Sequence, residues 1–431
     1  MMRVGFCTLG CKVSQYETEA IAEAFRGRGY TVCDFSSACD VYVINTCTVT
    51  AEADRKSRQM IRRAIAKNPG AVVLVCGCYS QRSPESVAAI EGVSGVIGSS
   101  GKLGLVDMAE QIMQHGGQLV HVTDVDSEPF EPMCITGGSR TRVYVKIEDG
   151  CESKCTYCAI PSARGRVRSK PWDDVIREVE ALAESGVYEV VLTGIETGSW
   201  GRDLPGKPTL GELIAELDRR GKVGRIRLGS LAPELVGADF VESVRGASVL
   251  APHFHISIQS GSDRVLAAMK RRYTRARALE VIARIKKNIP RATFTTDIMV
   301  GFPGESEEDF LESMSFVREA GLLDAHVFQY SKREGTLAAT YPDQVSEDVK
   351  HSRSERLIAE VARTRAEVLD GILELGEPME AVIEQNRTGM WYGHTDTFVE
   401  VAVKSDADLR GKVKKVLPVT RKDGVLICEI V

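Results

Sequence analysis

The chain has 431 residues, enough for roughly three domains and for a core that needs no disulfide bonds. Hydrophobic residues make up 43% and charged residues 27%, which excludes a disordered, collagen-like or coiled-coil protein. The net charge of −5 excludes a uniformly basic nucleic-acid coat protein, but not local basic patches. We find no signal peptide and no apolar run near the about 20 residues that span a bilayer, so we expect a cytoplasmic protein without a membrane segment.

The first third of the chain alternates between strand and helix patterns. Strands are predicted over Arg3–Leu9, Val41–Asn45 and Val72–Cys76. Helices are predicted from a capping box at Ser14–Glu17 to about Arg26, from an N-cap at Thr50 to about Lys67, and from Ser83–Pro84. This alternation predicts an N-terminal α/β domain with a parallel sheet over residues 1–132.

The middle of the chain repeats this rhythm after a linker predicted over Glu128–Ser139. Candidate strands lie over Val143–Ile147, Val187–Thr193, Arg225–Ser230, His253–Ile258, Thr293–Val300 and Ala325–Tyr330. Helices are predicted between several of them, for example over Asp173–Glu184 and Glu307–Ala320, and a charged helix follows over Ser346–Leu369. About six βα units predict a central partial (β/α) TIM-like barrel over residues 138–368.

The last sixty or so residues change to short strand patterns separated by turn signals. Strands are predicted over Ala381–Glu384, Thr397–Val403, Gly411–Leu417 and Val425–Val431. The turn signals include Arg387–Gly389 and Lys422–Gly424. The pattern predicts a small, OB-like C-terminal β-barrel over residues 371–431.

Three cysteines close to one another carry the clearest chemical signal. Cys151, Cys155 and Cys158 are spaced C-x3-C-x2-C, and twelve cysteines in a cytosolic chain favour metal or redox chemistry over disulfides. Iron–sulfur clusters normally take four thiolates, so three would leave one iron open to a substrate or cofactor. The alternative is a structural zinc site with a distant fourth ligand, in a non-catalytic RNA-binding protein.

A second set of three cysteines is spread over the first third of the chain. Cys11, Cys47 and Cys78 each follow a predicted strand, with spacings of about one βαβ unit. Because ligands bind at the carboxyl ends of parallel strands, we expect a second three-cysteine site. Cys76 could compete with Cys78, which lies beyond the strand in a predicted turn. The other cysteines are expected to be small core residues, namely Cys7, Cys33, Cys39, Cys76, Cys134 and Cys428.

The segments around these cysteines resemble the radical S-adenosylmethionine (SAM) methylthiotransferase family. The resemblance rests on Thr8–Lys12, Ile44–Thr50, Cys76–Gln81 and Cys151–Cys158, and it covers essentially the whole chain. The tail resembles the TRAM RNA-binding module of that family. The stretch Gly10–Glu17 is similar to the branch that acts on N6-threonylcarbamoyladenosine in tRNA, although Ser14 stands where that branch often has Asn.

The resemblance implies a transferase that adds a methylthio group to C2 of N6-threonylcarbamoyladenosine at position 37 of tRNA. It implies two [4Fe–4S] clusters. Cys151, Cys155 and Cys158 would hold the one that cleaves SAM to a 5′-deoxyadenosyl radical. Cys11, Cys47 and Cys78 would hold the one that supplies or keeps the sulfur. An electron donor such as a flavodoxin or ferredoxin is implied, and the oligomeric state stays open. Isopentenyladenosine in tRNA, or a ribosomal protein, is the alternative substrate.

The resemblance also implies residues that hold SAM, with no catalytic residue beyond the cluster ligands. These are Tyr157, Gly194, Glu196, Ser257, Gln259 and Gly301, and the individual role of Glu196 stays open.

Local basic patches favour contact with the anticodon loop of tRNA, because phosphate neutralisation dominates nucleic-acid affinity. Two of these patches flank the proposed cluster sites. The candidate RNA-binding residues are Arg62, Arg63, Arg164, Arg166, Arg271, Arg272, Lys414 and Lys415.

Overall fold

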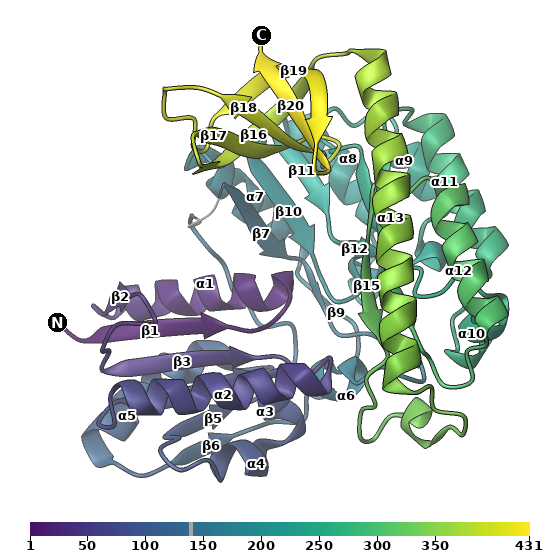
Figure 1. The fold of residues 1–431 in the computed structure, drawn as a ribbon. Helices are drawn as coiled ribbons and strands as arrows, with labels where there is room; N and C mark the ends of the chain where they lie inside the picture. The colour runs from purple at the N-terminus through teal and green to yellow at the C-terminus, as the bar shows by residue number, and fades with distance from the viewer. Residues whose placement is uncertain (138–140) are drawn as a thin grey trace.

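The computed structural model describes residues 1–137 and 141–431. Positions 138–140 lie outside the described residues, and with them Arg140, the end of the predicted linker and the start of the predicted barrel domain. Figure 1 shows a purple α/β layer at the N-terminus, a curved wall of teal and green strands with helices outside it, and a yellow β-module at the C-terminus.

The N-terminal part is a six-stranded parallel sheet in the order β2-β1-β3-β4-β5-β6. Its elements are β1 (Arg3–Thr8), α1 (Lys12–Gly27), β2 (Thr31–Cys33), β3 (Val41–Thr46), α2 (Ala51–Lys67), β4 (Val72–Gly77), α3 (Cys78–Arg82), α4 (Pro84–Ala88), β5 (Gly95–Ile97), η1 (Lys102–Gly104), α5 (Leu105–His115) and β6 (Leu119–His121). Apolar side chains of α1 and α5 cover one face and those of α2 the other. The predicted parallel sheet is therefore confirmed.

The first helix begins earlier than the sequence predicts. Cys11 is its N-cap residue, so Ser14 lies inside α1 and the predicted capping box is wrong. The physical reason is that Glu17 is fully buried and forms ion pairs with residues distant in sequence, instead of reaching back to cap the helix. The predicted cap at Thr50 is confirmed, since its side chain accepts a hydrogen bond from the Ala53 amide.

The central wall consists of two parallel sheets in the orders β11-β10-β7 and β12-β13-β14-β15. Only Gly229 separates β11 from β12, so the two sheets continue one another as an open, partial barrel, as predicted. Its elements are β7 (Arg142–Lys146), β8 (Glu148–Asp149), α6 (Ile160–Arg164), β9 (Arg168–Ser169), α7 (Trp172–Glu184), β10 (Glu189–Thr193), η2 (Thr197–Ser199), α8 (Leu210–Arg220), β11 (Arg225–Leu228), β12 (Ser230–Leu231), η3 (Pro233–Leu235), α9 (Ala238–Val244), β13 (His253–Ile256), α10 (Asp263–Ala268), α11 (Arg275–Asn288), β14 (Thr293–Val300), α12 (Glu307–Ala320), β15 (Asp324–Gln329), η4 (Leu337–Thr340) and α13 (Glu347–Leu375).

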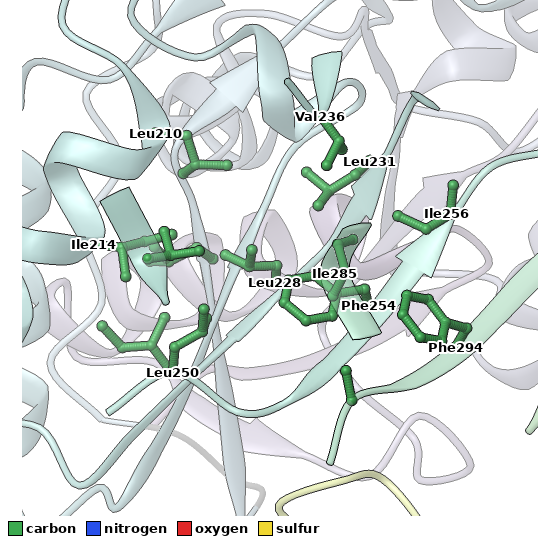
Figure 2. Packing of buried hydrophobic residues seen from close by; sticks show 14 of the residues in the cluster. Leu210, Ile214, Leu228, Leu231, Val236, Leu250, Phe254, Ile256, Ile285 and Phe294 are labelled. Carbon is green, nitrogen blue, oxygen red and sulfur yellow. The ribbon is translucent and has the colours of Figure 1, made fainter. Parts of the chain in front are cut away.

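The core of the barrel lies between these strands and the outer helices. Figure 2 shows Leu228 and Phe254 of the strands packed among Ile214 of α8 and Ile285 of α11. Alternate strand residues face the opposite side of the wall. That side carries polar and charged groups, among them Arg227 and His255.

The predicted linker is only partly a linker. Met133 and Ile135 are fully buried in the barrel core, and the Met133 carbonyl accepts a hydrogen bond of 2.7 Å from the Tyr16 hydroxyl of α1. The segment therefore ties the N-terminal layer to the barrel. At the C-terminal end of the barrel domain, α13 continues to Leu375, past the predicted limit at 368. The exact domain limits stay predictions.

The C-terminal module is a closed five-stranded barrel in the order β16-β17-β18-β20-β19. Its strands are β16 (Met379–Arg387), β17 (Met390–Thr395), β18 (Glu400–Lys404), β19 (Val413–Lys422) and β20 (Val425–Ile430). The prediction missed β17. The module docks on the amino ends of the wall strands, where Arg142 and Arg225 form ion pairs of 2.7 and 2.5 Å with Glu384 and Glu380 (Figure 1). Over the parts of the chain that the structure describes, no helix is both long and apolar enough to cross a membrane.

Candidate active site

The loop that carries Cys151, Cys155 and Cys158 lies between β8 and α6. Gly150 opens it with φ +89°, and a Cβ there would lie 1.9 Å from the Arg166 carbonyl oxygen, so only glycine fits. Two backbone amides donate to sulfur, Ser153 to Cys151 Sγ (3.3 Å) and Ile160 to Cys158 Sγ (3.4 Å). Such bonds orient thiolate ligands and stabilise their negative charge.

The third sulfur of this loop is bound by an arginine. Arg271 donates to Cys155 Sγ at 3.1 Å and to the Ser257 carbonyl at 3.4 Å, and its guanidinium lies over the Tyr273 ring. Burial alone would lower the pKa of Arg271, but Tyr273, Tyr157 and Cys155 raise it overall. Its donors are engaged by Cys155, Tyr273 and Ser257, and its role as an RNA phosphate ligand stays a prediction.

The second set of cysteines lines one pocket of about 370 Å³. Cys11 precedes α1, Cys47 follows β3, and Cys78 is the first residue of α3, so it lies at the start of a helix and not in the predicted turn. Gly77 permits this abrupt change with φ +101°, since a Cβ there would lie 2.5 Å from the Thr46 carbonyl oxygen. The carboxyl ends of β1, β3 and β4 thus bring the three thiols together.

Residues of the barrel complete the wall of that pocket. Ile160, two residues after Cys158, and Ile195, after β10, line it together with the three cysteines. Helices α3 and α6, which begin at Cys78 and Ile160, pack against each other. Arg82 of α3 donates to the Ser162 hydroxyl of α6 at 3.1 Å. One helix of this pair therefore begins at a cysteine of the second set, and the other begins two residues after a cysteine of the first.

Several thiols of the two sets are shielded from water, whereas Cys11 is exposed. Burial raises the pKa of Cys151 to about 12 and those of Cys158 and Cys47 to about 11. At neutral pH these thiols keep their protons until a metal displaces them, so metal binding releases protons.

Buried charges join the two layers next to this site. Glu17 of α1 forms ion pairs with Lys102 (2.5 Å), Lys146 (3.1 Å) and Arg164 (2.5 Å). Burial alone would raise the pKa of Glu17, but these three cations hold it well below its usual value. Asp149 pairs with Lys146 and Arg164, both at 3.2 Å.

Arg164 also donates from Nε to Cys78 Sγ at 3.1 Å. It is fully buried. The prediction that it binds RNA phosphates is therefore wrong.

Three of the residues predicted to hold SAM lie beside or behind the cysteine loop. Glu196 accepts a hydrogen bond of 3.1 Å from the Ser153 hydroxyl. Gly194 packs on the buried Glu148, whose carboxylate would lie 2.4 Å from an added Cβ. Tyr157 packs against a buried apolar cluster that includes Met299.

The other three follow β13 and β14. The Ser257 carbonyl binds Arg271 and the Tyr273 hydroxyl. Gln259 adopts φ +70°, rare for a residue with a side chain, and its amide bonds to the Asp297 carbonyl. Gly301 has φ +72°, and a Cβ there would meet the Lys350 side chain. The structure thus arranges all six around the carboxyl ends of the barrel strands, and contact with SAM stays a prediction.

The remaining basic residues of the RNA prediction are accessible to different degrees. Arg62 and Arg63 are exposed on α2, as are Arg166 and Arg272 near the cysteine loop. In β19, Lys415 is exposed and Lys414 is half-buried. RNA binding by these six stays a prediction.

The cysteines outside both sets mostly behave as core residues. Cys39, Cys76 and Cys428 are buried, and burial raises the pKa of Cys76 to about 12. Cys7 and Cys33 pack partly against the core. Cys134 is exposed, so its predicted core position is wrong, because the backbone beside it turns Met133 and Ile135 inward instead.

Both sets suit iron–sulfur clusters by their donor chemistry. Each offers three thiols. Hydrogen-bond donors point at all three sulfurs of the first set, and in the second set Arg164 donates to Cys78 Sγ. In residues 1–137 and 141–431, no three His, Cys, Asp or Glu side chains are packed closely enough to hold a single metal ion. The thiols of the second set line a shared space and do not meet at one point.

Comparison with known proteins decides the family. Residues 145–317 match the radical SAM superfamily, and residues 3–98 match the uncharacterized protein family UPF0004. The threonylcarbamoyladenosine tRNA methylthiotransferase MtaB of Bacillus subtilis is 41% identical over 96% of this chain and 93% of its own length. The chain belongs to the radical SAM methylthiotransferase family.

Other members and a solved structure agree with this family. The tRNA-2-methylthio-N(6)-dimethylallyladenosine synthase of Acetivibrio thermocellus is 33% identical over 95% of this chain and 87% of its own. The radical SAM methyltransferase TsrM of Kitasatospora setae has the same fold. Its TM-score is 0.56 at 15% identity, over 78% of this chain and 77% of that one. Radical SAM methylthiotransferases are enzymes that use SAM and [4Fe–4S] clusters.

Sequence reasoning missed two functional contacts, Arg271 to Cys155 and Arg164 to Cys78. The partners lie 116 and 86 residues apart in the chain. Charged residues within apolar segments, such as Lys146 in β7, were the available signal that buried ion pairs lie nearby.

Proposed function

We propose that the chain adds a methylthio group to C2 of N6-threonylcarbamoyladenosine at position 37, in the anticodon loop of cytoplasmic tRNA. The observation that carries the proposal is the packing of α3, which begins at Cys78, against α6, which follows Cys158, with Ile160 in the wall of the second set's pocket. One set would hold the SAM-binding cluster and the other the sulfur-bearing cluster. The name of the Bacillus subtilis relative supports this substrate.

One residue beside the second set also favours this substrate. Lys12 follows Cys11, and burial lowers its pKa, with Arg227, Asp297 and Arg142 as charged neighbours. Its ammonium thus lies between the cysteine pocket and charged strands of the barrel. A threonylcarbamoyl group ends in a carboxylate that this ammonium would attract, whereas a dimethylallyl group carries no charge.

The protein's own residues position and shield the reactants. When bound, SAM and the clusters supply the radical that abstracts hydrogen, the sulfur and the methyl group. Cys151, Cys155 and Cys158 would hold one cluster, with Arg271 fixing the loop through Cys155 and Ser257. Ile160 and Ile195 form an apolar part of the wall of the pocket of the other three cysteines. A flavodoxin- or ferredoxin-like protein would supply the electrons.

The deciding experiment is a nucleoside mass spectrum. Anaerobically reconstituted protein receives SAM, a strong reductant and two tRNA samples without methylthio groups, one with threonylcarbamoyladenosine and one with isopentenyladenosine. The expected product is 2-methylthio-N6-threonylcarbamoyladenosine alone. Methylthiolation of isopentenyladenosine instead would overturn the substrate. SAM cleavage without either product would point to a target other than tRNA.

A further inference from the structure

One buried arginine connects the two layers of the protein to the second cysteine set. Arg164 ends α6, the helix that begins two residues after Cys158, and its guanidinium divides its donors between two groups. Nε points to Cys78 Sγ at 3.1 Å, while the two terminal nitrogens bind Glu17 and Asp149. No part of its side chain is exposed.

The charges around Arg164 do not balance. The buried group contains the carboxylates Glu17 and Asp149 and four cations, Lys102, Lys146, Arg164 and Arg168. A further carboxyl lies nearby, Glu131, and even when it is counted as ionised the cations outnumber the carboxylates. Uncompensated buried charge is costly, so an excess of cations beside three thiols fits an anionic occupant of the cysteine pocket. An iron–sulfur cluster ligated by thiolates is an anion of this kind.

We propose that Arg164 is a positioning residue that holds Cys78 at the domain interface and raises the reduction potential of the cluster held by Cys11, Cys47 and Cys78. The inference rests on the proposed function, because it takes these cysteines as cluster ligands. A hydrogen bond to a cluster sulfur, and a positive charge beside it, stabilise the reduced state, which carries one more negative charge. Arg164 supplies both, and its Glu17 and Asp149 contacts fix its position.

The test uses full-length protein in which Cys151, Cys155 and Cys158 are replaced by Ala, so that only the cluster of the second set assembles. The midpoint potential is measured by redox titration with electron paramagnetic resonance. In this background, Arg164→Met is expected to shift the midpoint to a more negative value and to speed iron loss to a chelator. Arg164→Lys keeps the charge, so its midpoint potential should lie between that of the background protein and that of Arg164→Met.

Lys102→Met is the matched control. It removes one cation from the same buried group but no hydrogen bond to sulfur, so its shift should be smaller than that of Arg164→Met. Equal shifts in the two variants, or none in Arg164→Met, would overturn the role of Arg164. If Arg164→Met does not fold, Arg164→Lys with an unchanged midpoint would overturn it as well. If the triple cysteine variant binds no iron at all, the second cluster, and with it the proposed function, fails instead.

Discussion

Arg82 donates a hydrogen bond of 3.1 Å to the Ser162 hydroxyl, and this bond joins the helix that begins at Cys78 to the helix that follows Cys158. The same arginine also binds the Glu334 carbonyl at 2.6 Å, after β15. The two cysteine sets therefore share one mechanical support, although more than 70 residues separate them in the chain. A substitution in either cysteine set therefore changes one part of a site that also contains the other set.

Replacing Cys155 with Ala is expected to abolish SAM cleavage while leaving tRNA binding largely intact. The change removes one of the three thiols of this loop, and the sequence that follows the loop has no further cysteine close by to replace it. The measurement is 5′-deoxyadenosine formation under strong reductant, alongside tRNA affinity. Cys134→Ala, an exposed cysteine outside both sets, should retain wild-type cleavage. Continued cleavage by Cys155→Ala would show that the radical chemistry is located elsewhere.

Replacing Cys47 with Ala should separate the two halves of the reaction. The variant loses a ligand of the second pocket only, so iron content should fall by roughly half while SAM cleavage persists and methylthiolation stops. Iron and acid-labile sulfide are measured on anaerobically reconstituted protein, together with the nucleoside products. An unchanged iron content would mean that this pocket holds no cluster.

The Glu17→Gln variant is expected to be strongly destabilised. Glu17 is the shared partner of three buried cations, and breaking a buried ion pair from one side costs about 3–5 kcal/mol. The free energy of unfolding is measured by denaturant titration. The control is Glu52→Gln, whose surface pair with Arg55 is exposed to solvent and should contribute little to stability. Similar losses in both variants would contradict this account.

Glu305 should give the protein a pH-dependent stability. Burial raises its pKa to about 7, despite hydrogen bonds from the Gly301 amide and Arg353. The folded state thus holds a proton that the unfolded state, with an ordinary pKa of about 4.3, releases earlier. Stability is therefore expected to fall as pH rises between about 4.3 and about 7, and to level off above.

The Glu305→Gln variant should lack this part of the pH dependence. Unfolding free energies of both proteins are compared across that range, where each unit of pKa difference corresponds to about 1.4 kcal/mol. Glu347→Gln, which removes an exposed carboxylate, is the control. Identical slopes in wild type and Glu305→Gln would refute the raised pKa.

Charge reversal at Arg62 and Arg63 is expected to weaken tRNA binding without changing SAM cleavage. Both side chains are exposed on α2, the helix that follows Cys47. Each lost phosphate contact should reduce the dependence of affinity on salt by about one unit of slope. Affinity is measured at several salt concentrations. Arg245→Glu, at the C-cap of the outer helix α9, is the control. An unchanged slope for the double variant would exclude α2 from the RNA interface.

The sequence predicted some elements at their observed limits. β14 and α12 have the predicted bounds, since β14 is a buried run and Ser306 and Asp309 form a capping box that fixes the start of α12. The turn at Arg387–Gly389 is present, with φ +51° at Thr388 and +85° at Gly389. The strand after it was missed because Gly393 interrupts its pattern. Gly393 is required there, since a Cβ would lie 2.2 Å from the Val382 carbonyl oxygen.

The misses at the site have a different physical cause. Arg164 and Arg166 stand two positions apart in one basic segment, yet the first is buried and the second exposed. A run of basic residues shows only how many charges a segment carries. The burial of Arg164 depends on its partner Glu17, which lies 147 residues earlier in the chain. The joining of Cys11, Cys47 and Cys78, by contrast, follows from the order of strands in a parallel sheet, and local patterns were enough to predict it.

The position of the β-module determines the distance that an RNA would have to span to contact both the module and the cysteine pocket. Lys415 lies in the pocket between the module and the amino ends of the barrel strands, beside Arg225, whereas Ile195 and the cysteine pocket lie past the carboxyl end of β10. β14, with its eight residues, separates such ends by roughly 25 Å. One flipped nucleotide is too short to contact both places, so an RNA bound at both would have to extend along the barrel by several nucleotides.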